Sequence, residues 1–235
     1  VCLPGSFDME DKYVTGTAIM QGSLCQLPEA CSALLRVGRP AVDLVLGDPD
    51  IQPGVIEEID GWCRVAMVLR SYKDCTIGYL GHTYDGMLDM NVDPTAITGA
   101  FGIYCKMLEM CELVKHVEEA TDKQVQTKIE EMKDIFVFPG ASGDPLTRQA
   151  TPEQIAWSAR CALGLGTLVE QHDLGGLAYY YEGENGSIHE QVAAGLIVGN
   201  TLLTSRGISL AGEADMKTCI AMKTTSALGA GGSFA

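Results

Sequence analysis

The sequence predicts an α/β protein with parallel-sheet βαβ layers. Three observations support this prediction: short apolar runs rich in β-branched residues, longer stretches with helical apolar spacing between them, and glycine or proline at the breaks. A strand, a helix and a second strand at this spacing form a βαβ unit, in which the two strands are parallel.

The first βαβ unit is expected within residues 41–80. A helix over 28–37 begins at its proline and stops at a glycine. The apolar run 41–46 is expected to be a short strand that ends at a Gly-Asp-Pro turn. A helix over 55–70 and a strand over 76–80 complete the unit. The apolar face of the helix consists of Val55, Ile59, Trp62, Ala66 and Leu69.

The second half of the chain continues the alternation. Capping-box sequences begin at Thr121 and Thr151, each with glutamine three residues later, and each opens a helix. Composition changes near 71–73 and 211 predict boundaries that divide the chain into 1–72, 73–210 and 211–235. The expected elements are helices over 109–120, 121–135, 151–170, 188–205 and 214–228, an aromatic strand over 177–181, and a short apolar segment over 208–211.

The net charge disfavours some classes of binding partner, and the cysteine content indicates the redox compartment. The chain carries 31 acidic and 16 basic side chains, a formal charge of −15, which disfavours nucleic acid and anionic membranes as partners. No apolar stretch reaches the roughly 18–20 residues of a membrane helix. The nine cysteines are odd in number and lack C-x-x-C spacing. These features predict a reduced, cytoplasmic protein without a disulfide framework or zinc site.

The first candidate site follows the strand over 76–80. It contains His82, Tyr84, Asp85 and Asp89, and loops that leave the carboxyl ends of parallel strands are where open α/β sheets bind ligands. A histidine here is equally consistent with an ordinary loop residue, and Asp89 with a turn cap.

The second candidate is the tyrosine run in 177–186. Alternation along a strand places Tyr179 and Tyr181 on one face and Tyr180 on the other. We expect Tyr179 to pack in the core. Tyr181 or Glu182, at the carboxyl end of the strand, is positioned to line a sugar pocket.

The third candidate is Glu213, which is expected in the first turn of the last helix. A carboxylate there commonly compensates the helix dipole, and Asp215 in the same turn favours that reading. Alternatively, Glu213 binds a hard divalent cation, which prefers oxygen ligands. One carboxylate does not build such a site, so its partners would lie elsewhere. The glycine run 229–232 has neither a P-loop lysine nor dinucleotide-fingerprint spacing.

Three segments together resemble the L-arabinose isomerase family. They are GYLGHTYDGMLDM, GLAYYYEG with AGLIVGNTLLTSRGI, and LAGEADMKT with GAGGSF. In the family, a Gly-Glu-x-Asp-x-Lys-Thr run contains a catalytic, metal-binding glutamate, and this role carries over to Glu213. The second family glutamate follows a segment similar to 231–235 and is not in this chain. The two metal-binding histidines of the family are not matched by His82, His116, His172 or His189.

The resemblance implies a fold and a reaction. It makes 1–72 the end of an N-terminal α/β domain, 73–210 a middle α/β domain and 211–235 the start of a C-terminal domain, so the chain is expected to be a fragment that is inactive alone. It implies an aldose–ketose isomerase that uses Mn²⁺ and forms a homo-oligomer. Glu213 would be both metal ligand and acid/base, whereas His82, Tyr84 and Tyr181 would contact the sugar.

Two other functions remain open. The same architecture occurs in sugar-binding modules that perform no chemistry, and a purely structural domain that mediates oligomer contacts is the simplest alternative. The segment His82–Met87 departs from the better-known arabinose isomerases, so L-arabinose is the first substrate to test and other aldoses follow.

Overall fold

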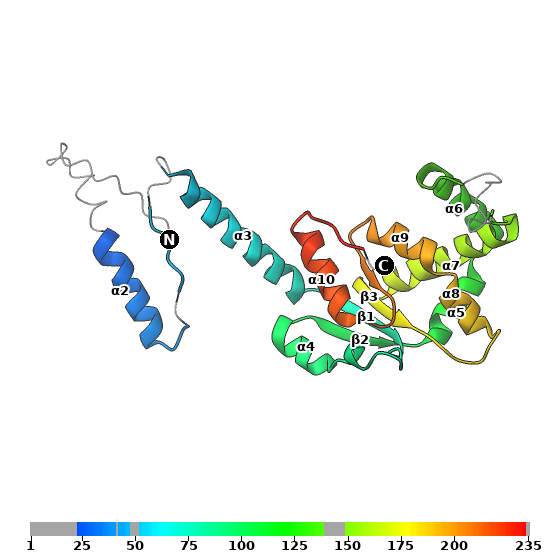
Figure 1. Cartoon of the computed structure of the whole chain (residues 1–235), viewed down its shortest axis with the longest axis horizontal. Helices are drawn as coiled ribbons and strands as arrows, with labels where there is room; N and C mark the ends of the chain where they lie inside the picture. Colours follow the sequence, from blue (N-terminus) through cyan, green and yellow to red (C-terminus); the bar gives the residue numbers. More distant parts are fainter. Residues whose placement is uncertain (1–22, 41, 48–51, 139–148, 234–235) are drawn as a thin grey trace. The chain divides into compact units, whose positions relative to one another are not determined.

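The computed structural model describes residues 23–40, 42–47, 52–138 and 149–233 (Figure 1). The chain divides into two compact units, Val1–Ala66 and Met67–Ala235, and the boundary lies within helix α3 (Pro53–Lys73). Residues 139–148, and the Asp-Pro part of the predicted turn after the run 41–46, lie outside the described residues. None of the described helices is long and apolar enough to cross a membrane.

The second unit is built on a parallel sheet of four strands in the order β2-β1-β3-β4 (Figure 1). Gly78 in the centre of β1 is level with Lys106 of β2 and Leu177 of β3. The parallel α/β class predicted from the sequence is therefore confirmed. The strands are β1 (Thr76–Gly81), β2 (Tyr104–Leu108), β3 (Leu174–Tyr180) and β4 (Ser209–Ala211).

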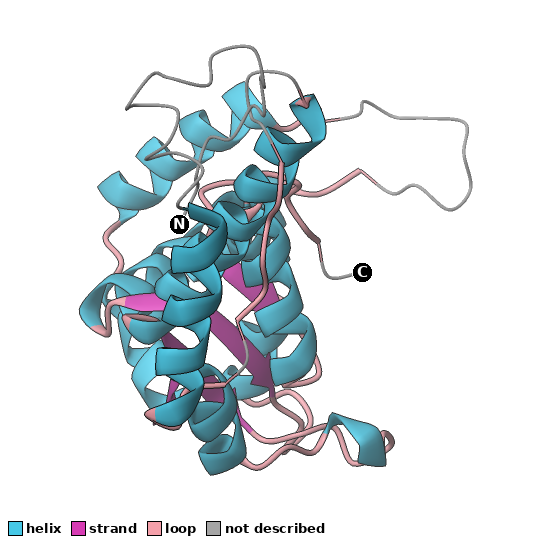
Figure 2. Cartoon of the chain, turned by 90° about the vertical axis from the view of Figure 1, so that its left-hand side faces the viewer, coloured by secondary structure: helices cyan, strands magenta, loops and turns pink. Residues whose placement is uncertain are grey.

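Helices cover both faces of this sheet (Figure 2). Successive strand residues point to opposite faces, so Leu177 joins one apolar cluster and Ala178 the other. The larger cluster packs against α5 (Met110–Glu119), α7 (Pro152–Gln171), α8 (Ile188–Ala194) and α9 (Ile197–Thr204). The smaller cluster packs against the end of α3, α4 (Pro94–Phe101) and α10 (Met216–Ala227).

The two predicted capping boxes are confirmed. The side chain of Thr121 caps α6 (Asp122–Ile135), and that of Thr151 caps α7. In each case the side-chain oxygen of a glutamine three residues later accepts a hydrogen bond from the backbone nitrogen of the cap residue, at 2.8 Å for Thr121 and 2.9 Å for Thr151. The reciprocal bonds fix where both helices begin, since they satisfy amide groups that the helix itself leaves unpaired.

The predicted strand at 41–46 is wrong for the described residues 42–46, which form an irregular segment. A strand requires a neighbour that accepts and donates backbone hydrogen bonds, and the described part of the first unit supplies none. Val42, Leu44 and Leu46 are exposed, although the segment lines an apolar groove of about 630 Å³ with residues of α2 (Ser23–Arg36) and α3. The first βαβ unit is therefore absent from this part of the chain.

Two helix predictions also require correction, and one helix was not predicted. Helix α2 begins at Ser23 and contains Pro28 in its interior, so the proline does not start it. The expected long helix over 188–205 is interrupted at Gly195, giving α8 and α9. A Cβ at Gly195 would lie 2.6 Å from Sγ of Cys161, so the break sits at a close approach to α7. Helix α4 was not predicted.

Strand β2 was also not predicted. It is an edge strand in which Tyr104 and Met107 are each 61% exposed and Lys106 is half-buried. Its residues therefore lack the alternation of apolar and polar side chains that marks a half-buried strand.

Candidate functional site

The candidate site lies where β1, β3 and β4 end. Gly81, the last residue of β1, has φ = 83°, and a Cβ there would lie 2.0 Å from the carbonyl oxygen of Tyr180. Only glycine fits this combination of left-handed backbone and close contact. The backbone nitrogen of His82 then donates to the Tyr180 oxygen at 3.1 Å, so the two loops leave the sheet together.

Aromatic rings from these two loops form one cluster. The His82 ring meets Tyr180 edge-on at a centroid distance of 5.4 Å and also contacts Tyr181 at 6.2 Å. Tyr84 contacts Tyr180 at 5.2 Å. The ring of His189 from α8 is stacked on that of Tyr181 at a centroid distance of 5.6 Å. Aromatic faces of this type stack on the C–H groups of sugars and on other flat apolar surfaces.

Tyr180 is paired with a carboxylate. Its hydroxyl donates a hydrogen bond to Oε2 of Glu182 at 2.8 Å. This bond is the main reason that the pKa of Tyr180 is raised to about 12, with smaller contributions from desolvation and from the charges of Glu182, Tyr84 and Glu213. Glu213 is therefore near enough to Tyr180 to act on its ionisation.

The position of Glu213 differs from the prediction. It precedes α10 rather than lying in its first turn, because the helix begins at Met216. Glu213 and Ala214 have φ values of 56° and 57°, which is unusual for residues with a Cβ. The cap is Asp215, which is 6% exposed and accepts bonds from the backbone nitrogens of Lys217 and Thr218, each at 3.0 Å.

Backbone contacts hold Glu213 beside the aromatic cluster. The nitrogen of Tyr84 donates to the carbonyl oxygen of Glu213 at 3.4 Å, and the nitrogen of Ala214 donates to the carbonyl oxygen of Tyr179 at 3.0 Å. Within the described ranges, the carboxylate of Glu213 makes no hydrogen bond or ion pair. It is half-buried, so the group is available to a ligand at this edge of the sheet.

The residues present do not form a metal site by themselves. Among the described residues, no group of three or more histidine, cysteine, aspartate or glutamate side chains is arranged to hold a metal ion. Divalent cations such as Mg²⁺ and Ca²⁺ take about six or more oxygen ligands in proteins and in water. Glu213 would therefore need ligands from outside the described part of the chain.

The structure brings together the three segments that the sequence singled out. His82, Tyr84, Tyr181 and Glu213 all lie at this edge of the sheet. Tyr179 packs against the larger core cluster, as expected, and Tyr181 shares that face of the strand, as the alternation predicted. The Tyr179 hydroxyl also receives a hydrogen bond from the side-chain amide of Asn200, and burial raises its pKa.

Two members of the aromatic cluster were not predicted. Tyr180 was assigned to the opposite face from Tyr181, and of the three tyrosines only Tyr179 and Tyr181 pack against the larger core cluster. The rings of Tyr180 and Tyr181 nevertheless both reach His82, which lies in the loop after β1. His189 lies on α8, and nothing in its sequence context marked it as a neighbour of Tyr181.

The fold and the site define an α/β domain with an aromatic and carboxylate cluster at the carboxyl ends of its parallel strands. The family model of the L-arabinose isomerase central domain matches residues 90–231, more than half of the chain, and the chain belongs to this family. The matched range contains Tyr181 and Glu213, whereas His82 and Tyr84 precede it. No curated protein matches the chain.

Proposed function

We propose that the chain is part of an aldose–ketose isomerase that acts on L-arabinose or a similar aldose, and that Glu213 moves a proton in this reaction. The observation that supports this role is the unengaged, half-buried carboxylate of Glu213 beside an aromatic cluster, in a chain of the L-arabinose isomerase family. Strained backbone conformations concentrate at functional sites, and two consecutive left-handed residues present this carboxylate.

The proposed chemistry is a proton transfer through a cis-enediol. Conversion of an aldose to a ketose removes the proton from C2 and delivers a proton to C1. A carboxylate accepts the first proton as a general base and, as a carboxylic acid, can return one. Glu213 is assigned this exchange, whereas His82, Tyr84 and Tyr181 form an aromatic wall that orients the open-chain sugar.

The metal is a separate part of the proposal. Mn²⁺ is expected from the family resemblance, and Glu213 would be one of its ligands. The described residues do not complete a site for a divalent cation. The role of Glu213 in proton transfer therefore rests on its carboxylate and its position alone.

The test is the Glu213→Gln variant of the complete protein, assayed for ketose formation from L-arabinose. Glutamine keeps the size and polarity of the side chain but cannot accept a proton, so we expect turnover to fall about 10²–10⁴-fold, with sugar binding and fold retained. The matched control is Glu184→Gln, an exposed carboxylate in the loop after β3. Undiminished turnover in Glu213→Gln would exclude this role.

A sugar-binding module without catalysis is the second candidate. The observation that favours it is the ring cluster of His82, Tyr84 and Tyr180, because aromatic rings bind sugars without any metal or acid/base group. Sugar binding by the complete wild-type protein, without turnover on a panel of aldoses and with Mn²⁺ supplied, would favour this candidate over the isomerase.

A further inference from the structure

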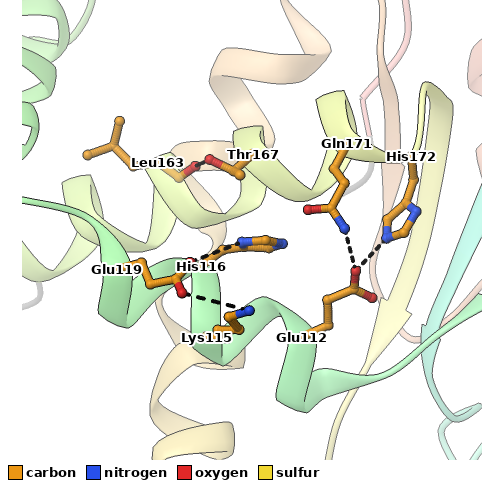
Figure 3. A network of polar contacts seen from close by, with 8 residues as sticks. All are labelled: Glu112, Lys115, His116, Glu119, Leu163, Thr167, Gln171 and His172. Carbon is orange, nitrogen blue, oxygen red and sulfur yellow. Dashed lines mark hydrogen bonds and ion pairs between the residues drawn. The ribbon is translucent and has the colours of Figure 1, made fainter.

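A second set of polar side chains joins strand β2 to helices α5 and α7, separate from the loops around Glu213. Nε2 of His172, the residue that ends α7, lies 2.7 Å from Oε1 of Glu112 in α5 (Figure 3). The side-chain amide of Gln171 donates to the same oxygen at 2.9 Å. The other ring nitrogen of His172, Nδ1, lies 2.6 Å from Nζ of Lys106 in β2.

The chemistry of these groups fixes the direction of each hydrogen bond. A carboxylate only accepts, so Nε2 of His172 carries the hydrogen that points to Glu112. A lysine ammonium only donates, so Nδ1 of His172 is an unprotonated acceptor that faces Lys106. The order amine, imidazole and carboxylate matches that of a catalytic triad, with lysine in the place of the nucleophile.

This arrangement places His172 to accept a proton from Nζ of Lys106 when the amine attacks an electrophile. A proton that passes from Nζ to Nδ1 leaves an imidazolium whose other nitrogen faces the negative charge of Glu112. The side chains of His172 and Glu112 are only 13% and 29% exposed, which strengthens their mutual attraction relative to a surface pair. The neutral amine is the nucleophilic form of lysine.

The position of Lys106 permits attack on a molecule from solvent. Strand β2 lies at the edge of the described sheet, and the flanking Tyr104 and Met107 are each 61% exposed. Lys106 itself is half-buried, so the amine is held against His172 while the edge of the strand stays accessible.

We propose that Lys106 is a modification site that takes an acyl group from a small acyl thioester, with His172 as its base and Glu112 as the residue that positions His172. Nζ attacks the thioester carbonyl carbon, an N–C bond forms and the C–S bond breaks. The thiolate leaves with the electron pair and takes up a proton to become the thiol. The products are the lysine amide, the thiol and one proton released to solvent, and no group is oxidised or reduced.

The experiment treats the folded chain with N,S-diacetylcysteamine, a small acyl thioester, and follows acetylation of each lysine by mass spectrometry of peptides. Lys128 is the matched control, because its Nζ is paired with a carboxylate, Glu131, but not with a histidine, and it is 16% exposed. Lys133, paired with Glu130 and 55% exposed, shows what accessibility alone contributes. We expect Lys106 to react at least about tenfold faster than either control.

Two variants separate a base from a structural contact. His172→Gln keeps a polar side chain but removes the base, and the rate at Lys106 is expected to fall to that of Lys128. Glu112→Gln keeps a hydrogen-bond acceptor for His172 and removes the charge, so a smaller decrease of severalfold is expected. Circular dichroism confirms that each variant is folded, and if His172→Gln is not, the Glu112→Gln result decides.

Two results would overturn the proposal. The first is acetylation of Lys106 at a rate no higher than that of the two control lysines. The second is an unchanged rate at Lys106 in a folded variant, which would show that the Lys106–His172–Glu112 contacts only join β2, α5 and α7.

Discussion

Two glutamates of the same domain, Glu112 and Glu213, are held in opposite ways. Glu112 lies on a regular helix, and its carboxylate is engaged by the side chains of His172 and Gln171. Glu213 lies on a left-handed turn, and its carboxylate has no such partner among the described residues, although its backbone is bonded to the loop after β1. Side-chain contacts fix the first carboxylate, whereas the backbone fixes the second.

A carboxylate that stabilises the fold through hydrogen bonds is less able to bind a ligand, and an unengaged carboxylate contributes less to stability. Hydrogen bonds to Glu112 stabilise the packing of α5 against α7 and make its carboxylate less available. A left-handed residue with a Cβ costs roughly 1–2 kcal/mol, so Glu213 is presented at the expense of stability. We therefore expect removal of the Glu112 carboxylate to lower stability and relief of the backbone strain at Glu213 to raise it.

The largest effect is expected for the backbone contact that supports the Glu213 loops. Gly81→Ala would place a Cβ 2.0 Å from the Tyr180 oxygen and would also require a left-handed alanine. We expect a loss of about 3 kcal/mol in the free energy of unfolding, measured with urea. Gly186→Ala is the control, since Gly186 has φ = 76° but no atom within 4 Å of a Cβ. Equal losses for the two variants would show that the close contact is unimportant.

A smaller loss is expected when the engaged carboxylate is removed. Glu112→Ala leaves His172 and Gln171 without their shared acceptor, which costs about 1–2 kcal/mol for partly buried groups. Glu213→Ala removes no side-chain bond and is expected to leave the unfolding free energy within about 0.5 kcal/mol of wild type. Equal stability of the two variants in urea would show that the hydrogen bonds to Glu112 do not stabilise the fold.

The sequence predicted the sheet where burial produces a clear pattern. Strands β1 and β3 carry apolar residues such as Ile77 and Leu177 that are fully buried, and both strands were predicted. The edge strand β2 contains Lys106 and exposed Met107, so no such pattern exists. The run 42–46 has the pattern but no partner strand in the described residues, and pairing is a property that local sequence does not encode.

Four residues of the site were predicted because the buried strands that precede them have a clear apolar pattern. The loops that follow such strands can be found from the sequence, so His82, Tyr84, Tyr181 and Glu213 were singled out. Tyr180 was not, because its contact with His82 depends on how the loop after β1 passes beside the end of β3. The left-handed turn at Glu213 was also missed, since neither Glu213 nor Ala214 is a glycine that would have indicated it.

A gain in stability is expected when the strain at Glu213 is relieved. Glu213→Gly adopts φ = 56° without a steric cost, and after the added chain entropy of glycine we expect a gain of about 0.5–1 kcal/mol, measured by urea unfolding. Turnover of the complete protein should be lost. Asp173→Gly is the control, because Asp173 has φ = 48° outside the site and should gain stability with turnover unchanged. A loss of stability in Glu213→Gly would show that its backbone is not strained.

The smallest effect on the free energy of unfolding is expected from the ionisation of Tyr180 at high pH. Its pKa is raised from 10 to about 12 in the folded chain, chiefly by the hydrogen bond to Glu182, so the folded state holds this proton more tightly than the unfolded state. The resulting stability is fully present below about pH 10 and is lost as the pH rises toward 12. The loss is small because the hydrogen bond between Tyr180 and Glu182 is exposed to solvent, which screens it. Buried cysteines such as Cys219, with a pKa of about 12, titrate in the same range, so the measured quantity is the difference in unfolding free energy between wild type and Tyr180→Phe.

We expect the difference in unfolding free energy between wild type and Tyr180→Phe to shrink between pH 9 and pH 12. Absorbance at 295 nm should show one fewer late-titrating phenol in the variant. A difference that does not change with pH would mean that the Tyr180–Glu182 bond does not form in solution, and the carboxylate of Glu182 would then be as unengaged as that of Glu213.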